Sequence, residues 1–286
     1  MKISELLKQN KATISFEVFP PKKADGIDKV KLATEEICAL HPDFMSVTYG
    51  AAGSTSKYTI EIAANLHEKY GVTVLPHLTC VASTREHVAD MVQQIEAKNI
   101  ENIMALRGDI PQDGRVEHDF EHASDLIREI KAQSDLCIGG ACYPEGHIEC
   151  THKEEDIMHL KEKVDAGCDF LTTQMFFANN ILYNFLYRIR EKGINVPVLA
   201  GIMPITNAKQ LSRSVALSGT NVPERFRAIV DHFGEEPEAM KQAGIVYASE
   251  QIIDLIANGV THIHVYSMNK PDVAAAIMKN LSEVLK

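Results

Sequence analysis

The chain has 286 residues, of which 45% are hydrophobic and 24% are charged. This composition is typical of a globular protein with a large core, and the length fits either two domains or one α/β barrel. The net charge of −10 and the pI of about 5.6 argue against nucleic acid or an anionic membrane surface as partner, because phosphate binding needs a basic face. The first residues mix charges with apolar side chains, unlike a signal peptide, and no window approaches a membrane span. We therefore expect a cytoplasmic protein.

The six cysteines are spread along the chain, and most lie in apolar runs, which favours reduced thiols in the core over disulfides. A metal site is the alternative for one group of residues that are close in sequence, namely Cys142, His147, Cys150, His152 and His159. Neither a CxxC nor an HExxH spacing occurs, so we expect no metal.

The first predicted strand covers residues 13–19 and contains one carboxylate, Glu17, before two prolines end it. A buried carboxylate is costly unless it is paired or protonated, so Glu17 is either a structural ion pair or a tuned acid. Its place near a strand end favours the tuned acid. The pattern then predicts a helix over 25–39, a strand over 44–47 that closes on Thr48 and Tyr49, and a polar, ligand-facing loop over 50–56.

A helix over 59–69 and a strand over 72–75 come next, and the strand ends in Pro76 and His77. A lone histidine is more often a satisfied core residue than a catalytic one. Ser83 or Thr84 then caps a helix with apolar residues at helical spacing.

The strand over 102–106 is a short apolar run that closes on Arg107, Gly108 and Asp109. Such a run reads as a buried parallel strand that delivers polar groups to its C-terminal end, where α/β folds place their chemistry. The polar segment over 111–121 is long enough to cover a site.

The rest of the chain repeats this alternation. The predicted elements are a helix over 123–132, a strand over 137–141, a helix over 154–166, a strand over 169–173, a helix over 183–191, a strand over 196–202, two or three helical stretches over 208–258, a strand over 262–265 and a last helix. Eight strands alternating with helices predict a single-domain (β/α)8 TIM barrel. A doubly wound open sheet is the competitor, but polar or turn residues at the ends of all eight strands suit a ring better than one crevice. No GxGxxG follows a strand, which excludes a Rossmann type of nucleotide site.

Seven short motifs give a more specific indication. They are Ser15-Phe-Glu-Val-Phe-Pro-Pro21, Ser46-Val-Thr-Tyr-Gly50, Pro76-His-Leu-Thr79, Ala105-Leu-Arg-Gly-Asp109, Ala141-Cys-Tyr-Pro-Glu145 with His147, Thr173-Gln-Met-Phe-Phe177, and Gly201-Ile-Met-Pro204 with Gln210. Their order and spacing resemble the methylenetetrahydrofolate reductase family, in its bacterial form that has the catalytic barrel alone. The resemblance covers essentially the whole chain.

The resemblance implies a barrel enzyme that uses FAD to reduce 5,10-methylenetetrahydrofolate to 5-methyltetrahydrofolate, with hydride from NADH or NADPH in a ping-pong cycle. Glu17 matches the family's general acid, which protonates the leaving folate nitrogen. Asp109 matches a carboxylate near flavin and pterin that stabilises the cationic iminium. The positions that match FAD contacts are Thr48, Tyr49, Ala51, His77, Arg107, Gly108, Asp109, Ala123, Tyr143, His147, Asp156, His159 and Lys163. The positions that match substrate contacts are Asp109, Gln174, Gln210 and Lys270.

Several residues depart from the family pattern. Glu162 stands where an arginine helps to hold the FAD phosphates, Ser214 where an aromatic ring packs on the dinucleotide, and Lys270 where an arginine meets the glutamate tail of the substrate, so the electron source and the retention of FAD are open. A partner flavoprotein or iron–sulfur subunit is the alternative electron donor. A flavin-free pterin methyltransferase and a non-catalytic folate-binding or assembly subunit are the alternative functions. The family also implies a homo-oligomer.

Overall fold

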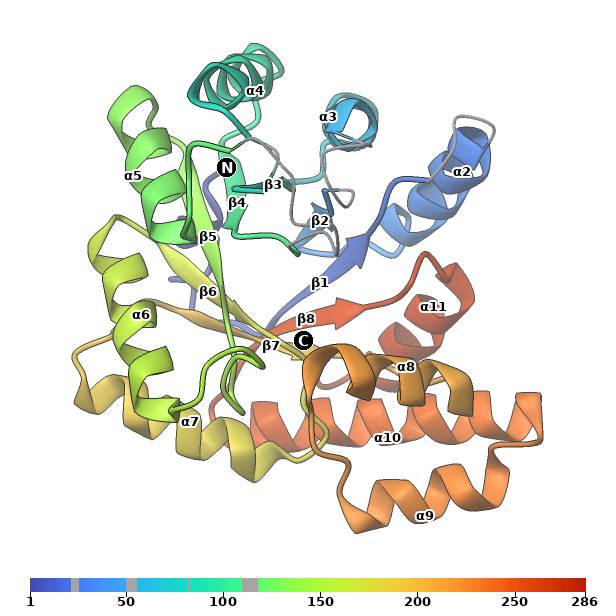
Figure 1. Cartoon of the computed structure of the whole chain (residues 1–286). Helices are drawn as coiled ribbons and strands as arrows, with labels where there is room; N and C mark the ends of the chain where they lie inside the picture. The colour runs from blue at the N-terminus through green and yellow to red at the C-terminus, as the bar shows by residue number, and fades with distance from the viewer. Residues whose placement is uncertain (22–25, 50–55, 82, 110–117) are drawn as a thin grey trace.

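The computed structural model describes residues 1–21, 26–49, 56–81, 83–109 and 118–286. Eight parallel strands form a closed barrel in sequence order, which confirms the predicted (β/α)8 fold and excludes the doubly wound sheet (Figure 1). The strands are β1 (Thr13–Val18), β2 (Phe44–Val47), β3 (Val74–Thr79), β4 (Asn102–Leu106), β5 (Cys137–Cys142), β6 (Phe170–Thr173), β7 (Val198–Ile202) and β8 (His262–Tyr266).

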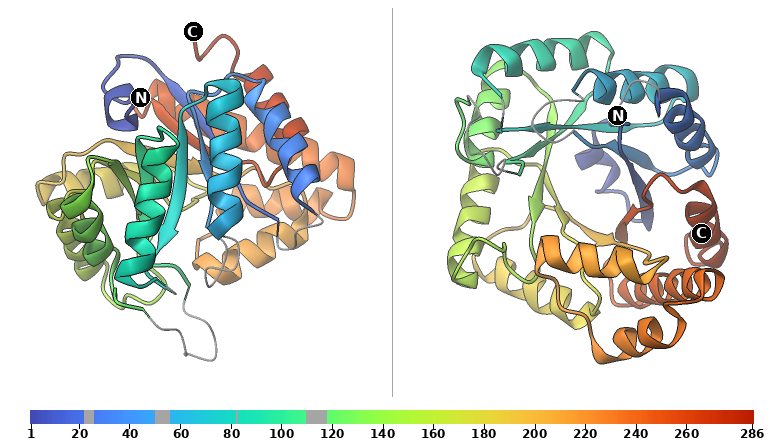
Figure 2. Two further views of the ribbon diagram at one scale, coloured as in Figure 1. Left: turned by 90° about the horizontal axis from the view of Figure 1, so that it is seen from above. Right: turned by 45° about the vertical axis from the view of Figure 1, so that its right-hand side comes forward.

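Helices surround the barrel, as the two further views show (Figure 2). They are α2 (Ile27–Cys38), α3 (Ser56–Tyr70), α4 (Arg85–Ala97), α5 (Ala123–Gln133), α6 (Lys153–Asp165), α7 (Asn179–Glu191), α8 (Ala208–Ser218), α9 (Glu224–Phe233), α10 (Pro237–Ala257) and α11 (Pro271–Asn280). Thr84 is the N-cap of α4, where its side chain accepts a hydrogen bond from the amide of His87, as predicted. None of the helices in the described part of the chain is long and apolar enough to cross a membrane.

Alternating residues of the strands face two different cores. Odd positions of β1 face the barrel interior, whereas Ile14, Phe16 and Val18 pack with the surrounding helices. The end of the barrel interior nearer the N-termini of the strands is filled by a separate apolar cluster from six strands: Phe44, Leu75, Met104, Cys137, Phe170 and Leu199. A short helix that the sequence analysis did not predict, α1 (Ile3–Leu6), packs against this cluster from the N-terminal end of the barrel. The apolar filling leaves the polar interior to the C-terminal ends of the strands.

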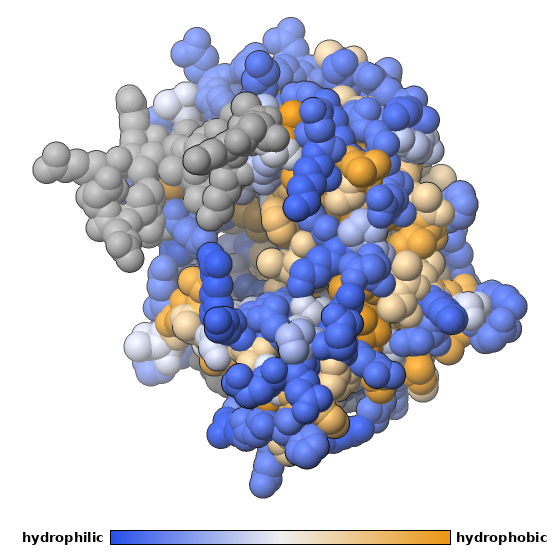
Figure 3. All heavy atoms as spheres, turned by 90° about the vertical axis from the view of Figure 1, so that its right-hand side faces the viewer, coloured by the Kyte–Doolittle hydropathy of each residue, from blue (hydrophilic) through white to orange (hydrophobic). Residues whose placement is uncertain are grey.

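The segment between β7 and β8 holds α8, α9 and α10, in agreement with the two or three predicted helices. These helices share a third apolar cluster, in which the rings of Phe226 and Tyr247 stack with centroids 4.2 Å apart. Gly244 of α10 permits the close approach to the loop after β7, because a Cβ there would lie 1.7 Å from the carbonyl oxygen of Ile205. The face of the molecule in Figure 3 is mainly hydrophilic with scattered apolar side chains, as is usual for a globular protein.

One strand boundary was predicted wrongly. The strand expected over 72–75 is β3, which runs from Val74 to Thr79, so that His77 lies inside the strand and not after it. The strand was expected to end at Pro76 and His77, yet Pro76 pairs with Val47 of β2, and His77 pairs with Met104 of β4. Pairing on both sides keeps the backbone extended and overrides the local preference of proline. The six cysteines are free, five of them buried, which confirms the predicted reduced thiols.

Candidate active site

A cavity of about 420 Å³ opens among the C-terminal ends of the strands. Its walls carry most of the residues that the motifs singled out from the first half of the chain. The residues predicted as site residues that line it are Glu17, Thr48, Tyr49, His77, Arg107, Gly108, Asp109, Tyr143, His147 and Gln174. The fold therefore brings together groups that lie more than 150 residues apart in the sequence.

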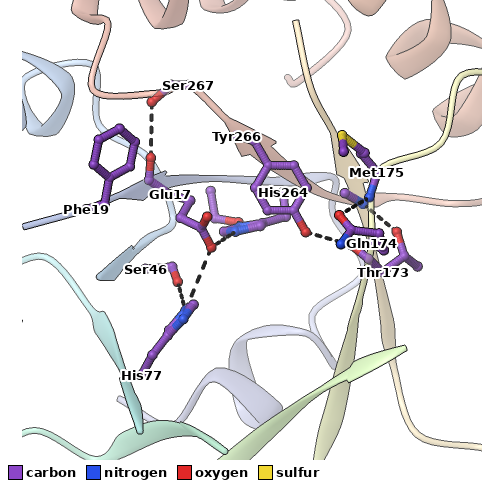
Figure 4. A network of polar contacts seen from close by, with 12 residues as sticks. Glu17, Phe19, Ser46, His77, Thr173, Gln174, Met175, His264, Tyr266 and Ser267 are labelled. Atoms are coloured by element: carbon purple, nitrogen blue, oxygen red, sulfur yellow. Dashed lines mark hydrogen bonds and ion pairs between the residues drawn. The ribbon is translucent and has the colours of Figure 1, made fainter. Parts of the chain in front are cut away.

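Glu17 lies between two imidazole rings in this cavity (Figure 4). Its Oε2 is 3.6 Å from Nε2 of His264 and 3.8 Å from Nε2 of His77. Both histidines are buried, while the Glu17 side chain keeps 20% of its surface exposed. Burial lowers the pKa of His77 to about 4, so His77 is neutral near pH 7. The carboxyl group thus faces the open cavity from a wall of buried polar side chains.

A hydroxyl group holds each of these histidines. Ser46 Oγ lies 2.5 Å from Nε2 of His77, and Ser15 Oγ lies 2.8 Å from Nδ1 of His264. Ser15 and His264 are register partners on the paired strands β1 and β8. Both rings are therefore fixed in position before any ligand arrives.

Tyr266 and Gln174 close the far side of the cavity. The phenol of Tyr266 donates to the carbonyl of Thr173 at 2.6 Å, and its ring stands edge-on to His264 with centroids 5.2 Å apart. This hydrogen bond requires a glycine at position 201 on β7, since a Cβ there would lie 2.8 Å from the phenol oxygen of Tyr266 and 2.2 Å from the Thr173 carbonyl oxygen. The side-chain oxygen Oε1 of Gln174 accepts a hydrogen bond from the backbone amide of Met175. The side-chain NH2 group of Gln174 is left to donate to a ligand.

A second cavity of about 380 Å³ adjoins the first and shares five lining residues with it: Leu106, Arg107, Ala141, Tyr143 and His147. It runs between the N-terminal end of α5 and one side of α6, and it holds the remaining predicted cofactor residues, Ala123, Asp156, His159 and Lys163. The predicted residue Ala51 lies outside the described residues. Together the two adjoining cavities form one continuous groove, which has room for an elongated ligand.

The charges of the second cavity are unusual for a site that would hold phosphates. Its cations are Arg107 and Lys163, whereas its walls carry four carboxylates, from Glu149, Glu155, Asp156 and Glu162. Arg107 binds Glu149 through both of its terminal nitrogens, at 2.5 and 3.0 Å. This bidentate contact raises the pKa of Arg107 and lowers that of Glu149.

Lys163 extends along the wall so that its ammonium group lies inside the protein and donates to the Ala141 carbonyl at 2.6 Å. Burial disfavours the charged form of both side chains. It therefore lowers the pKa of Lys163 and raises the pKa of the nearby Asp156. Burial and the charge of Arg107 lower the pKa of His147, whose ring stands edge-on to Tyr143 with centroids 4.6 Å apart. Of the two cations, Lys163 has a neutral carbonyl oxygen as its hydrogen-bond acceptor, so its charge could pair with a phosphate group, whereas Arg107 is already paired with Glu149.

Two predicted substrate residues lie beside the groove and not in its walls. Gln210 Oε1 accepts from the amide and the hydroxyl of Thr206, at 3.0 and 3.1 Å, and Lys270 donates to the same hydroxyl at 2.6 Å. Glu162, which differs from the arginine of the family pattern, is largely exposed, and its Oε2 lies 3.6 Å from Nδ1 of His159. Ser214 is buried against Met203.

Sequence reasoning missed several polar residues of this site: Ser15, Ser46, Glu149 and His264. A usable signal existed for three of them, because polar side chains alternate with apolar ones along β1, β2 and β8, as in the run His262-Ile-His-Val-Tyr266. Glu149 has no such signal. Among the residues that the structure describes, no group of three or more His, Cys, Asp or Glu side chains is arranged to hold a metal ion.

Comparison with known proteins identifies the family of the chain. A family model for methylenetetrahydrofolate reductase matches residues 2–282. The chain belongs to the methylenetetrahydrofolate reductase family. The 5,10-methylenetetrahydrofolate reductase of Pectobacterium carotovorum is 33% identical over 273 residues, which cover 96% of this chain and 91% of that protein. The Escherichia coli reductase is 31% identical over 274 residues, with 96% and 92% covered.

Plant members of the family are longer. The Arabidopsis thaliana protein named methylenetetrahydrofolate reductase (NADH) 1 is 34% identical over 295 residues, covering 98% of this chain and 50% of that protein. The chain thus spans about half the length of the plant relatives it matches. Among solved structures, a Clostridium thermocellum protein described as binding two copies of 5-methyl-5,6,7,8-tetrahydrofolic acid superposes with a TM-score of 0.70, covering 99% of this chain and 100% of that one, at 14% identity. At this identity the likeness concerns the fold alone.

Proposed function

We propose that this chain reduces 5,10-methylenetetrahydrofolate to 5-methyltetrahydrofolate with electrons from NADH, by a ping-pong cycle through bound FAD in the cytoplasm. The family supports the reaction, and the name of the plant relatives supports NADH as the donor. Bound FAD would supply hydride transfer in two stages. The single observation that carries the proposal is the place of Glu17, a partly exposed carboxyl group at the mouth of the barrel, between two fixed imidazoles and across one cavity from Gln174.

Glu17 would act as the acid of the folate half-reaction. Opening the five-membered ring of the substrate requires a proton on the leaving nitrogen, and Glu17 is the carboxyl group that projects into the cavity from its buried wall. Asp109 lines the same cavity from the end of β4, where its negative charge would stabilise the cationic iminium of the substrate. Gln174 would bind the pterin through its free amide group, and the Gln210–Thr206–Lys270 cluster would meet the more distant part of the substrate.

The chain's residues also suit the cofactor. The continuous groove would hold FAD with the ring system near Glu17 and His77 and the diphosphate near Arg107 and Lys163. A homo-oligomer and an electron-transfer partner subunit remain predictions, because the described chain is a single copy.

The test is Glu17→Gln in the FAD-loaded protein, with each half-reaction followed by flavin absorbance in a stopped-flow instrument. The amide keeps the shape but lacks the proton, so we expect NADH to bleach the flavin at nearly the normal rate and the folate half-reaction to slow by several orders of magnitude. Near-normal folate turnover in this variant would remove Glu17 from the mechanism. A wild-type protein that binds FAD but is bleached by a partner flavoprotein and not by NADH would shift the proposal to the partner subunit.

A further inference from the structure

A line of three polar side chains, which starts at a backbone carbonyl group, crosses the pairing of β1 with β8 in the barrel. Ser15 Oγ lies 3.1 Å from the carbonyl oxygen of Ile263 and 2.8 Å from Nδ1 of His264. Nε2 of His264 in turn lies 3.6 Å from Oε2 of Glu17 (Figure 4). Ser15 and His264 are 0% and 2% exposed, so the contact between Ser15 Oγ and Nδ1 of His264 is shielded from bulk water, whereas Nε2 of His264 faces the cavity with Glu17. The hydrogen atoms along this line are therefore set by the protein groups themselves.

The Ile263 carbonyl can only accept a hydrogen bond, and a serine hydroxyl has one proton to give. If Ser15 donates to Ile263, its oxygen is left to accept from Nδ1–H of His264, and both contacts of the Ser15 hydroxyl group are hydrogen bonds. A neutral imidazole carries one N–H, so Nε2 then presents a lone pair to Glu17.

We propose that His264, held in its Nδ1–H tautomer by Ser15, is the positioning residue that keeps the proton on the Glu17 carboxyl group. A protonated Glu17 can donate to the bare Nε2, whereas a carboxylate would meet the lone pair and be disfavoured. The separation of 3.6 Å between Nε2 of His264 and Oε2 of Glu17 is longer than a hydrogen bond by roughly half an ångström, which a small rotation of the partly exposed carboxyl group can supply. This inference rests on the proposed role of Glu17 as an acid.

His77 cannot take the same role. It also faces Glu17, at 3.8 Å, but the nitrogen that does so is already bound by Ser46 at 2.5 Å. The two histidines are therefore distinct, and a matched pair of serine variants separates them. The titratable and charged side chains that line the same cavity are Glu17, Tyr49, His77, Arg107, Asp109, Tyr143, His147, His264 and Tyr266.

The direct test is nitrogen NMR of protein labelled with ¹⁵N-histidine, with His264→Gln identifying the His264 signals by their loss. We expect wild-type His264 to show a protonated Nδ1 and a bare Nε2. Ser15→Ala removes the acceptor for Nδ1–H, so the proton should move to Nε2, while Ser46→Ala should leave the His264 signals in place. Ser15→Thr keeps a hydroxyl group and should restore the wild-type signals, and it serves as the informative variant if alanine impairs folding.

The kinetic counterpart is the pH profile of the folate half-reaction, with flavin reduction by NADH as the internal reference. An Nε2–H in Ser15→Ala would stabilise the carboxylate, so the pH at which the folate half-reaction falls to half should drop by about one unit, with an approximately tenfold loss above it. Unchanged His264 signals and an unchanged profile in Ser15→Ala would overturn the inference. A wild-type protein without folate activity would instead contradict the proposed function, and the NMR result would still decide the tautomer.

Discussion

The pair between Arg107 and Glu149 leads to a prediction about cofactor affinity. The diphosphate of FAD would have to displace the Glu149 carboxylate, which occupies both terminal nitrogens of Arg107 in the described structure. Glu149→Gln should therefore tighten FAD binding. The Glu149 side chain is 54% exposed and that of Arg107 28%, so solvent screens the pair, and its contribution is about 0.2 to 1 kcal/mol. Releasing it corresponds to a dissociation constant lower by about 1.5-fold to fivefold.

Arg107→Ala provides the opposite limit. It removes a charge-assisted contact to the diphosphate, which contributes about 1.5 to 3 kcal/mol, so affinity should fall by about 10- to 150-fold. The assay is titration of the apoprotein with FAD by flavin fluorescence at several salt concentrations. Affinity of Glu149→Gln should decline more steeply with salt than that of the wild type, because salt also screens the competing pair that only the wild type has.

The matched control is Glu154→Gln, which makes the same change of charge at an exposed residue paired with Lys192, outside both cavities. It should leave the dissociation constant unchanged. Weaker FAD binding in Glu149→Gln would refute the reasoning, because Glu149 would then be orienting Arg107 for the phosphates and not competing with them. If neither Arg107→Ala nor Glu149→Gln alters binding, the diphosphate lies elsewhere.

Two further predictions concern the first cavity. Asp109→Asn should slow the folate half-reaction far more than flavin reduction, since its charge would act on a cation formed only with folate bound, and equal effects on both half-reactions, measured by stopped-flow, would contradict this role. The pKa of His77 is lowered by burial from 6.5 to about 4, so between these values the unfolded chain binds a proton that the folded protein does not. The free energy of unfolding should therefore fall by about 3 kcal/mol on acidification through this window and level off below it. Urea unfolding at pH 7.5 and 4.5 checks this, and His77→Gln should flatten the difference.

The barrel could be predicted because its signals are local. Each strand is a short apolar run that closes on polar residues, and each helix repeats apolar residues at helical spacing, so seven of the eight strands came within about two residues of their observed bounds. The exception, β3, fails for a physical reason, since pairing with β2 and β4 overrides the local effect of Pro76. The short helix α1 was missed because it is stabilised by packing under the barrel and not by its own length.

The candidate site was predicted unevenly. Residues at strand ends, such as Arg107 and Asp109, were found because a parallel strand delivers its last residues to the site. His264 was missed because it lies inside a strand, where its role depends on contact with a residue almost 250 positions earlier. Glu149 was missed because its loop meets Arg107 across 42 positions, and no pattern in the sequence encodes that pairing.

Closure of the barrel explains why an acid near the start of the chain depends on a histidine near its end. β1 pairs with both β2 and β8, so Glu17 has buried side chains on each flank, Ser46 and His77 on one and His264 on the other. In an open sheet with β1 at an edge, water would occupy one flank and would set the protonation of the carboxyl group. In the closed barrel, fixed dipoles take that place and need no reorganisation during the reaction. The folate half-reaction should therefore respond to substitutions of the β8 residue His264, which flanks Glu17 directly, more than to substitutions of Glu149, which lines only the second cavity.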